Sequence, residues 1–86
     1  MTDSELIEVA CKNATKILDL NYDKVSDHLS LVRIYFGLSH MLGGNEELMR
    51  HWIKTHNKHL GYCPIEGIEG DKTSDVLTYL EGNLFL

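Results

Sequence analysis

The chain has 86 residues, of which 43% are hydrophobic and 24% charged, and its formal net charge is −5. This length predicts one domain, and this composition is that of a globular protein rather than a disordered one. The acidic balance is a poor match for DNA, whose phosphates are neutralised by Lys and Arg. A chain this short buries only about 60–65% of its unfolded surface, so we expect it to gain stability by forming a homodimer.

The ends of the chain and its cysteines predict where the protein resides. The N-terminus is acidic where a secretory signal would be basic, and no apolar run approaches the roughly 18–20 residues of a membrane helix. The two cysteines, Cys11 and Cys63, form no Cys-x-x-Cys pair. We therefore expect reduced thiols in a cytoplasmic protein that does not enter a membrane.

Apolar spacing predicts helices in the first half of the chain. Thr2 and Glu5 fit a capping box, which predicts a helix over about residues 4–18. Asn21 can cap a second helical region, 22–42, read either as one helix or as two that meet near 29–31. The apolar positions that keep the helical period are Leu6, Val9, Ala10, Ala14, Ile17 and Leu18, and then Val25, Leu29, Val32, Phe36, Leu38 and Met41.

The second half shows equally clear helix boundaries. Two glycines, Gly43 and Gly44, end the preceding helix, and Asn45 is a good N-cap for the next. The apolar stripe of that helix is Leu48, Met49, Trp52 and Ile53. A turn follows, and Pro64 begins a short helix, 64–68.

The last helix is expected to begin at Asp71 or Thr73 and to end at Gly82, before an apolar tail, 83–86. Its predicted apolar face is Val76, Leu77 and Leu80. The sum is an all-α fold, a small bundle of four to five helices with short loops.

Two groups of residues carry potential chemistry. His51, His56, His59 and Cys63 are ligand types that zinc accepts, but a structural zinc site usually takes two close pairs and no second pair is present. The Cys63 thiol precedes a helix start, which can lower a thiol pKa, yet no third group completes a catalytic arrangement. We therefore expect neither a metal, nor a cofactor, nor enzymatic activity.

An ordered set of residues in the second half resembles a known family. The set is Trp52-Ile53, Asn57, Leu60-Gly61 and Pro64-Ile65-Glu66, followed by Gly70, Val76, Leu80 and Gly82. It resembles the toxin-binding domain of the Xre/MbcA/ParS antitoxin family over about residues 32–82. Antitoxins of that family bind and block RES-fold toxins, which consume NAD or use it to modify proteins.

The N-terminal part resembles a different module of the same family. Residues 18–30 resemble the first part of an Xre-type helix-turn-helix, but no recognition helix follows them. The resemblance thus divides the chain into a helix-turn-helix remnant, 1–31, and a toxin-binding-like part, 32–86, within one compact unit. An alternative function is that of a DNA-binding regulator of a small bacterial or phage operon.

The resemblance implies an antitoxin-like interaction protein of a bacterial toxin–antitoxin system, which occludes the active-site cleft of a RES-type toxin. Trp52 is expected to anchor the turn structurally. Lys54 and Lys58 would pair with toxin acids, and Asp71 and Asp75 with bases that hold NAD phosphates. The full set of expected toxin-binding residues is Lys54, Asn57, Lys58, Leu60, Gly61, Pro64, Asp71, Asp75, Leu84, Phe85 and Leu86.

Overall fold

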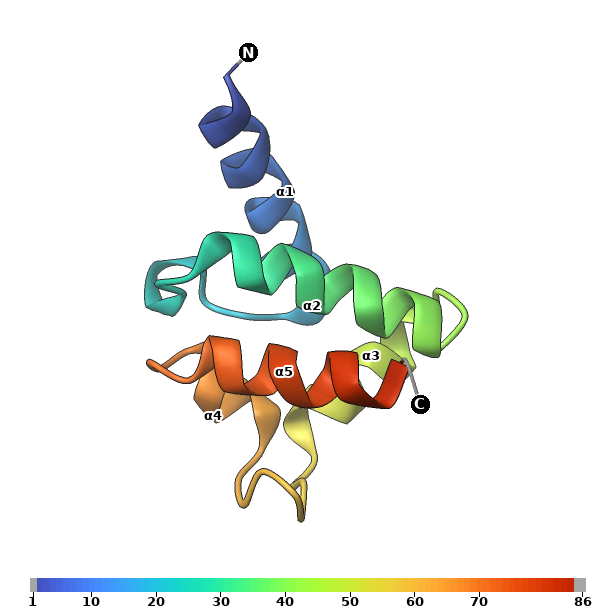
Figure 1. Cartoon of the computed structure of the whole chain (residues 1–86). Helices are drawn as coiled ribbons and strands as arrows, with labels where there is room; N and C mark the ends of the chain where they lie inside the picture. Colours follow the sequence, from blue (N-terminus) through green and yellow to red (C-terminus); the bar gives the residue numbers. More distant parts are fainter. Residues whose placement is uncertain (1, 85–86) are drawn as a thin grey trace.

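The computed structural model describes residues 2–84 and contains helices joined by short loops (Figure 1). The only β pairing within that range is an isolated bridge between Asn57 and Tyr62. The predicted all-α bundle is therefore confirmed. The elements are α1 (Asp3–Leu18), the 3-10 turn η1 (Tyr22–Lys24), α2 (His28–Met41), α3 (Glu46–Lys54), α4 (Pro64–Ile68) and α5 (Thr73–Leu84).

Side-chain caps set most of the helix starts. The Thr2 hydroxyl accepts from the backbone N–H of Glu5 at 3.2 Å, and the Asn45 amide oxygen accepts from that of Leu48 at 3.1 Å. The predicted caps at Thr2 and Asn45 are confirmed, but the Glu5 half of the expected capping box is not: its carboxylate accepts no hydrogen bond from the Thr2 backbone N–H. Asn21 also caps, but the element that follows it is η1, a single 3-10 turn.

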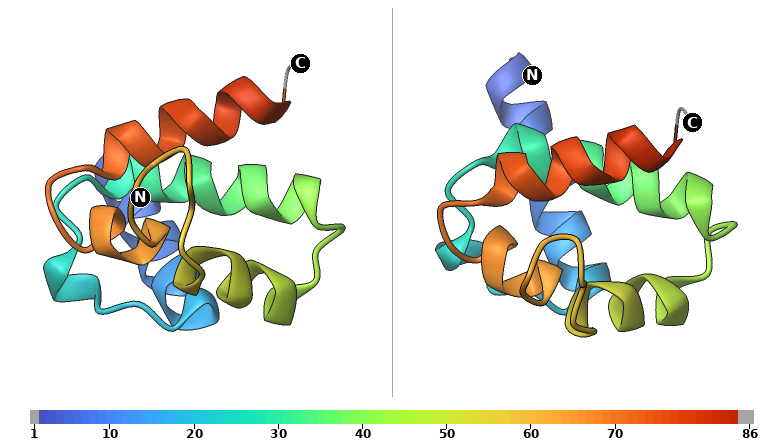
Figure 2. Two further views of the ribbon diagram at one scale, coloured as in Figure 1. Left: turned by 90° about the horizontal axis from the view of Figure 1, so that it is seen from below. Right: turned by 60° about the horizontal axis from the view of Figure 1, so that its bottom comes forward.

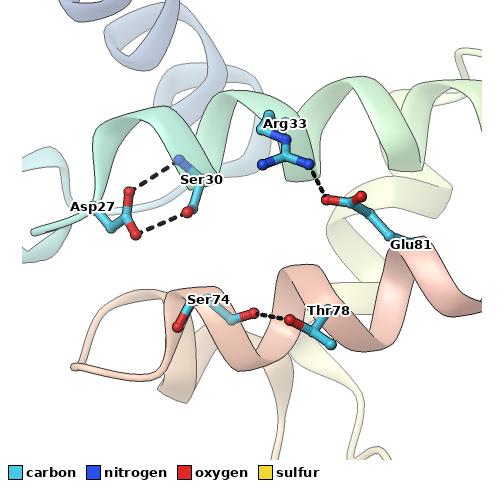
Figure 3. A network of polar contacts seen from close by, with 6 residues as sticks. All are labelled: Asp27, Ser30, Arg33, Ser74, Thr78 and Glu81. Carbon is cyan, nitrogen blue, oxygen red and sulfur yellow. Dashed lines mark hydrogen bonds and ion pairs between the residues drawn. The ribbon is translucent and has the colours of Figure 1, made fainter.

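The prediction for residues 22–42 is wrong, both as one helix and as two that meet near 29–31. The chain is extended at Val25, and α2 begins at His28 after the N-cap Asp27. The Asp27 carboxylate accepts from both the backbone N–H and the hydroxyl of Ser30 (Figure 3). This local hydrogen bonding starts a new helix even though the apolar spacing continues across the break.

Only part of the apolar face predicted for residues 22–42 is buried: Val25 and Leu38 are buried as predicted, but Leu29 and Phe36 are not. Leu29 and Phe36 are 52% and 63% exposed, whereas the fully buried positions are Leu31, Ile34 and Leu38. α2 carries apolar residues on both sides, so periodicity alone did not select the core side. Likewise Leu6 and Val9 of α1 are exposed, because the first half of α1 rises away from the other helices (Figure 1).

Gly82 does not end the last helix. α5 runs on to Leu84, and the Asn83 amide donates to the Tyr79 carbonyl at 2.8 Å. A glycine inside a helix costs only about 1 kcal/mol, which the packing of α5 outweighs. Phe85, Leu86 and the side chain of Leu84 lie outside the described residues, so the expectations placed on them stay predictions.

One hydrophobic core, which extends from Cys11 to Leu80, joins the two halves of the described chain. α2 and α5 run side by side in the same direction, and the Arg33 guanidinium pairs with the Glu81 carboxylate between them (Figures 2 and 3). Position 31/32, where the resemblance divides the chain, lies within α2. The core draws on both sides of it: Cys11, Ala14, Leu18, Val25, Leu31, Ile34, Leu38, Met49, Ile53, Ile68, Val76, Leu77 and Leu80. None of the described helices is both long and apolar enough to span a bilayer.

Candidate partner-binding site at the Asn57 turn

The segment 55–63, here called the Asn57 turn, links α3 to α4 and is held by hydrogen bonds of its own. The Asn57 side-chain oxygen accepts from the backbone N–H groups of His59 and Leu60, at 2.9 and 3.1 Å. The Asn57 backbone N–H donates to the Tyr62 carbonyl at 3.1 Å, and the Gly61 N–H donates to the Asn57 carbonyl at 2.8 Å. An asparagine at this position therefore closes the turn from the inside.

Gly61 closes the turn with a left-handed backbone. Its φ is +85°, and a Cβ added there would have no neighbour within 4 Å. The residue is thus required for its conformation and not for a close approach.

We expect Gly61→Ala to lower the free energy of unfolding by about 1–2 kcal/mol, which is the cost of a left-handed residue with a Cβ. The matched control is Gly82→Ala, since that position is also free of neighbours within 4 Å but lies inside α5. It is expected to raise the free energy of unfolding by about 0.5–1 kcal/mol. Urea denaturation followed by far-UV circular dichroism measures both. A neutral Gly61→Ala would show that the turn tolerates a side chain at this φ.

The turn leads directly into α4. Pro64 is the first residue of that helix and is buried, as its predicted role requires. The Glu66 carboxylate accepts from the backbone N–H of Cys63 at 3.2 Å, which satisfies a donor at the helix start. Pro64 therefore shapes the site from within, whereas Gly61 is exposed on its surface.

An aromatic cluster ties the Asn57 turn to α5. The Tyr79 ring stacks on Trp52, with 6.5 Å between centroids, and on His59, with 5.6 Å. Trp52 is partly buried and packs against the core, so its predicted role as an anchor agrees with its position. Tyr79 was not among the predicted site residues, although it lies three residues after the buried Val76 and shares that side of the helix.

A groove of about 240 Å³ opens beside the turn, between α3 and the end of α2. It is lined by Leu42, Leu48, His51, Trp52, Thr55, His56 and Asn57. Leu48 is 49% exposed here, which corrects its predicted place in the apolar stripe of α3, whereas Met49 and Ile53 are buried as predicted. Its lining combines the apolar side chains of Leu42, Leu48 and Trp52 with two histidines, a threonine and an asparagine.

One of the charged residues predicted to bind a partner already forms an ion pair within the chain. The Lys54 ammonium pairs with the Asp19 carboxylate at 2.9 Å, and this hydrogen bond and charge lower the pKa of Asp19. Lys58, Asp71 and Asp75 are exposed. Asp75 lies one helical turn before Tyr79, whose ring stacks on His59 of the Asn57 turn, whereas Asp71 lies in the loop between α4 and α5. Leu60 packs against the core.

The histidines and cysteines form no metal-binding group within residues 2–84. His51 and His56 line the same groove, but no group of three or more His, Cys, Asp or Glu in this range could hold a metal ion. Cys11 is fully buried, and burial raises the pKa of its thiol. Cys63 is partly buried at the start of a helix of only five residues.

A second and larger groove was missed by sequence reasoning. It measures about 610 Å³ and lies where α1, α2 and α3 meet. Its lining residues are Ala10, Asn13, Ala14, Lys16, Ile17, Val32, Tyr35, Phe36, Glu46 and Arg50. One feature of the sequence could have indicated this groove: α1 and α2 each carry more apolar residues than a single buried stripe requires.

No known protein family or relative assigns a function to this site. Neither a comparison with models of protein families nor one with curated proteins gives a match to this chain.

Proposed function

We propose that this chain is an antitoxin-like interaction protein that binds a RES-type toxin and blocks its NAD-binding cleft without chemistry of its own. The observation that carries the proposal is the Asn57 turn, whose hydrogen bonds are satisfied inside the chain. Such a turn presents a preformed surface, and a preformed surface loses little entropy on binding. The partner's identity comes from the resemblance of the Trp52–Gly82 pattern to the antitoxin family.

The proposed contact surface combines the groove beside Trp52 with the exposed charges around it. An apolar side chain of the toxin would fill the groove, and Lys58 would face an acidic residue at its rim. Asp75 would meet the bases that otherwise hold the phosphates of NAD. Lys54 contributes less in this scheme, because it would first have to leave Asp19. Charges at a rim act mainly on association rate and specificity.

The experiment requires a RES-type toxin encoded beside this chain. Co-expression should restore growth of cells that make the toxin, and isothermal titration with a catalytically inactive toxin should give a saturable complex. Combining Lys58→Glu with Asp75→Lys is expected to weaken binding at least tenfold, equal to about 1.4 kcal/mol. Both residues are exposed, so the variant should fold as the parent does.

The matched control is Lys24→Glu, the same reversal at an exposed position of η1, far from the turn along the chain. It should leave both affinity and rescue unchanged. The proposal is wrong if no RES-type reading frame accompanies the gene, if the chain fails to bind the toxin, or if Lys24→Glu weakens binding as much as the paired reversal.

A further inference from the structure

The larger groove is bordered by apolar residues that the fold leaves uncovered. Phe36 is the most exposed of the large hydrophobic residues, at 63%, and lies on its rim. Leu6 and Val9 are 53% and 49% exposed and precede the groove residues Ala10 and Asn13 by one helical turn each. They therefore extend the groove-facing side of α1 toward its N-terminus.

α1 supplies both halves of a possible self-contact. Its second half packs into the body through Cys11, Ala14, Thr15 and Leu18, whereas its first half rises clear of the other helices (Figures 1 and 2). The exposed half thus offers an apolar edge, and the packed half forms one wall of the groove that could receive it. In a pair of copies, the exposed half of each α1 can therefore pack against the groove of the other copy, and the two contacts are equivalent, as a two-fold interface requires.

The charges of α1 select the orientation of such a pair. The first half carries the acids Asp3, Glu5 and Glu8, and the second half carries the bases Lys12 and Lys16. Glu8 and Lys12 already pair with each other at 3.2 Å, which leaves Asp3, Glu5 and Lys16 for a second copy. α3 adds one base and one acid to the groove, Arg50 and Glu46. The Arg50 guanidinium donates to the Ile17 carbonyl at 2.8 Å and is thereby held at the end of α1. An antiparallel pairing of two α1 helices brings the acidic half of each copy against the basic half of the other.

The register follows from the same residues. If the helices cross near Ala10 and Asn13, Leu6 of one copy packs on Ile17 of the other. Glu5 then lies beside the partner copy's Lys16. The small Ala10 side chain at the crossing allows the two helices to approach closely. Phe36 closes the side of the contact from α2.

We propose that the groove between α1 and α2 is occupied by α1 of a second copy, in an antiparallel two-fold dimer. The groove lies apart from the Asn57 turn and shares no lining residue with the groove beside Trp52. A dimer formed here leaves the proposed toxin surface open on each copy. The dimer proposal and the toxin proposal can therefore fail independently.

Sedimentation equilibrium of the full chain over a wide range of concentration tests the surface. The parent should form a dimer, and Leu6→Glu should raise the dimer dissociation constant at least tenfold. Leu48→Glu is the matched control, since Leu48 is almost equally exposed but lines the other groove. It should leave the dissociation constant unchanged. Circular dichroism of each variant shows that the helices are retained.

Charge reversal tests the orientation. Glu5→Lys alone and Lys16→Glu alone should each weaken the dimer, because each places like charges together. The double variant should restore it, a result that only an antiparallel self-pair predicts. A chain that stays monomeric at every concentration, a dimer insensitive to Leu6→Glu, or no restoration in the double variant overturns the proposal. If the parent chain is itself monomeric and Leu6→Glu abolishes toxin binding, the groove belongs to the toxin instead.

Discussion

Leu38→Ala is expected to lower the free energy of unfolding by about 2–5 kcal/mol, the range for a large side chain removed from a close-packed interior. Leu38 is 0% exposed and lies on the side of α2 that packs toward the core. The variant loses the burial of the isobutyl group and leaves a cavity that the surrounding helices fill only in part. For a chain of this size, a loss at the upper end of that range approaches the whole stability.

The control for Leu38→Ala is the same change at Leu48, which is 49% exposed. A half-exposed leucine leaves no cavity, so we expect a loss of less than about 1 kcal/mol. Urea denaturation at a protein concentration low enough to keep the chain monomeric measures both variants. Equal losses in the two variants would mean that α2 turns a different side to the core.

Trp52→Ala is expected to cost about 2–3 kcal/mol of the free energy of unfolding. Trp52 is only partly buried, so its burial contributes less than that of a fully enclosed ring. The stacking of its ring on Tyr79 adds to that contribution and connects α3 to α5. Trp52→Phe keeps an aromatic ring at the site and is expected to cost less than about 1.5 kcal/mol.

A double-mutant cycle separates the stacking from the burial. Trp52→Ala, Tyr79→Ala and the double variant should show a coupling of about 0.5–1.5 kcal/mol, the range for an aromatic pair in contact. Because Trp52 is the only tryptophan, unfolding has to be followed by circular dichroism and not by fluorescence. Strict additivity of the two single changes would show that the rings do not stabilise each other.

Short-range chemistry along the chain predicted much of the local structure. The all-α class, the caps at Thr2 and Asn45, the stop at Gly43-Gly44 and the start at Pro64 all follow from short-range chemistry, and all are present. The turn was also predictable, because an asparagine side chain can bond the backbone of its own turn and a glycine can adopt the positive φ that the turn requires. The antitoxin function and its contact residues remain predictions.

The two errors in helix boundaries have one cause, which is that the sequence carried competing local signals at these positions. Apolar spacing ran through Val25 and Ser26 as if the helix continued, while the Asp27 carboxylate was already capping a new one. Gly82 looked like a stop, but no local bond enforces one, and α5 continues past it.

What the sequence by itself determined is therefore the all-α class, most of the helix starts and the turn between α3 and α4, since capping, glycine conformation and proline act within a few residues. Only the tertiary structure decided which side of α2 is buried, that Tyr79 joins Trp52 and His59, and that α1 projects to leave a groove. Those outcomes depend on how helices distant in the chain pack together. A helix that is apolar on two sides carries no information about which of them a neighbour will cover.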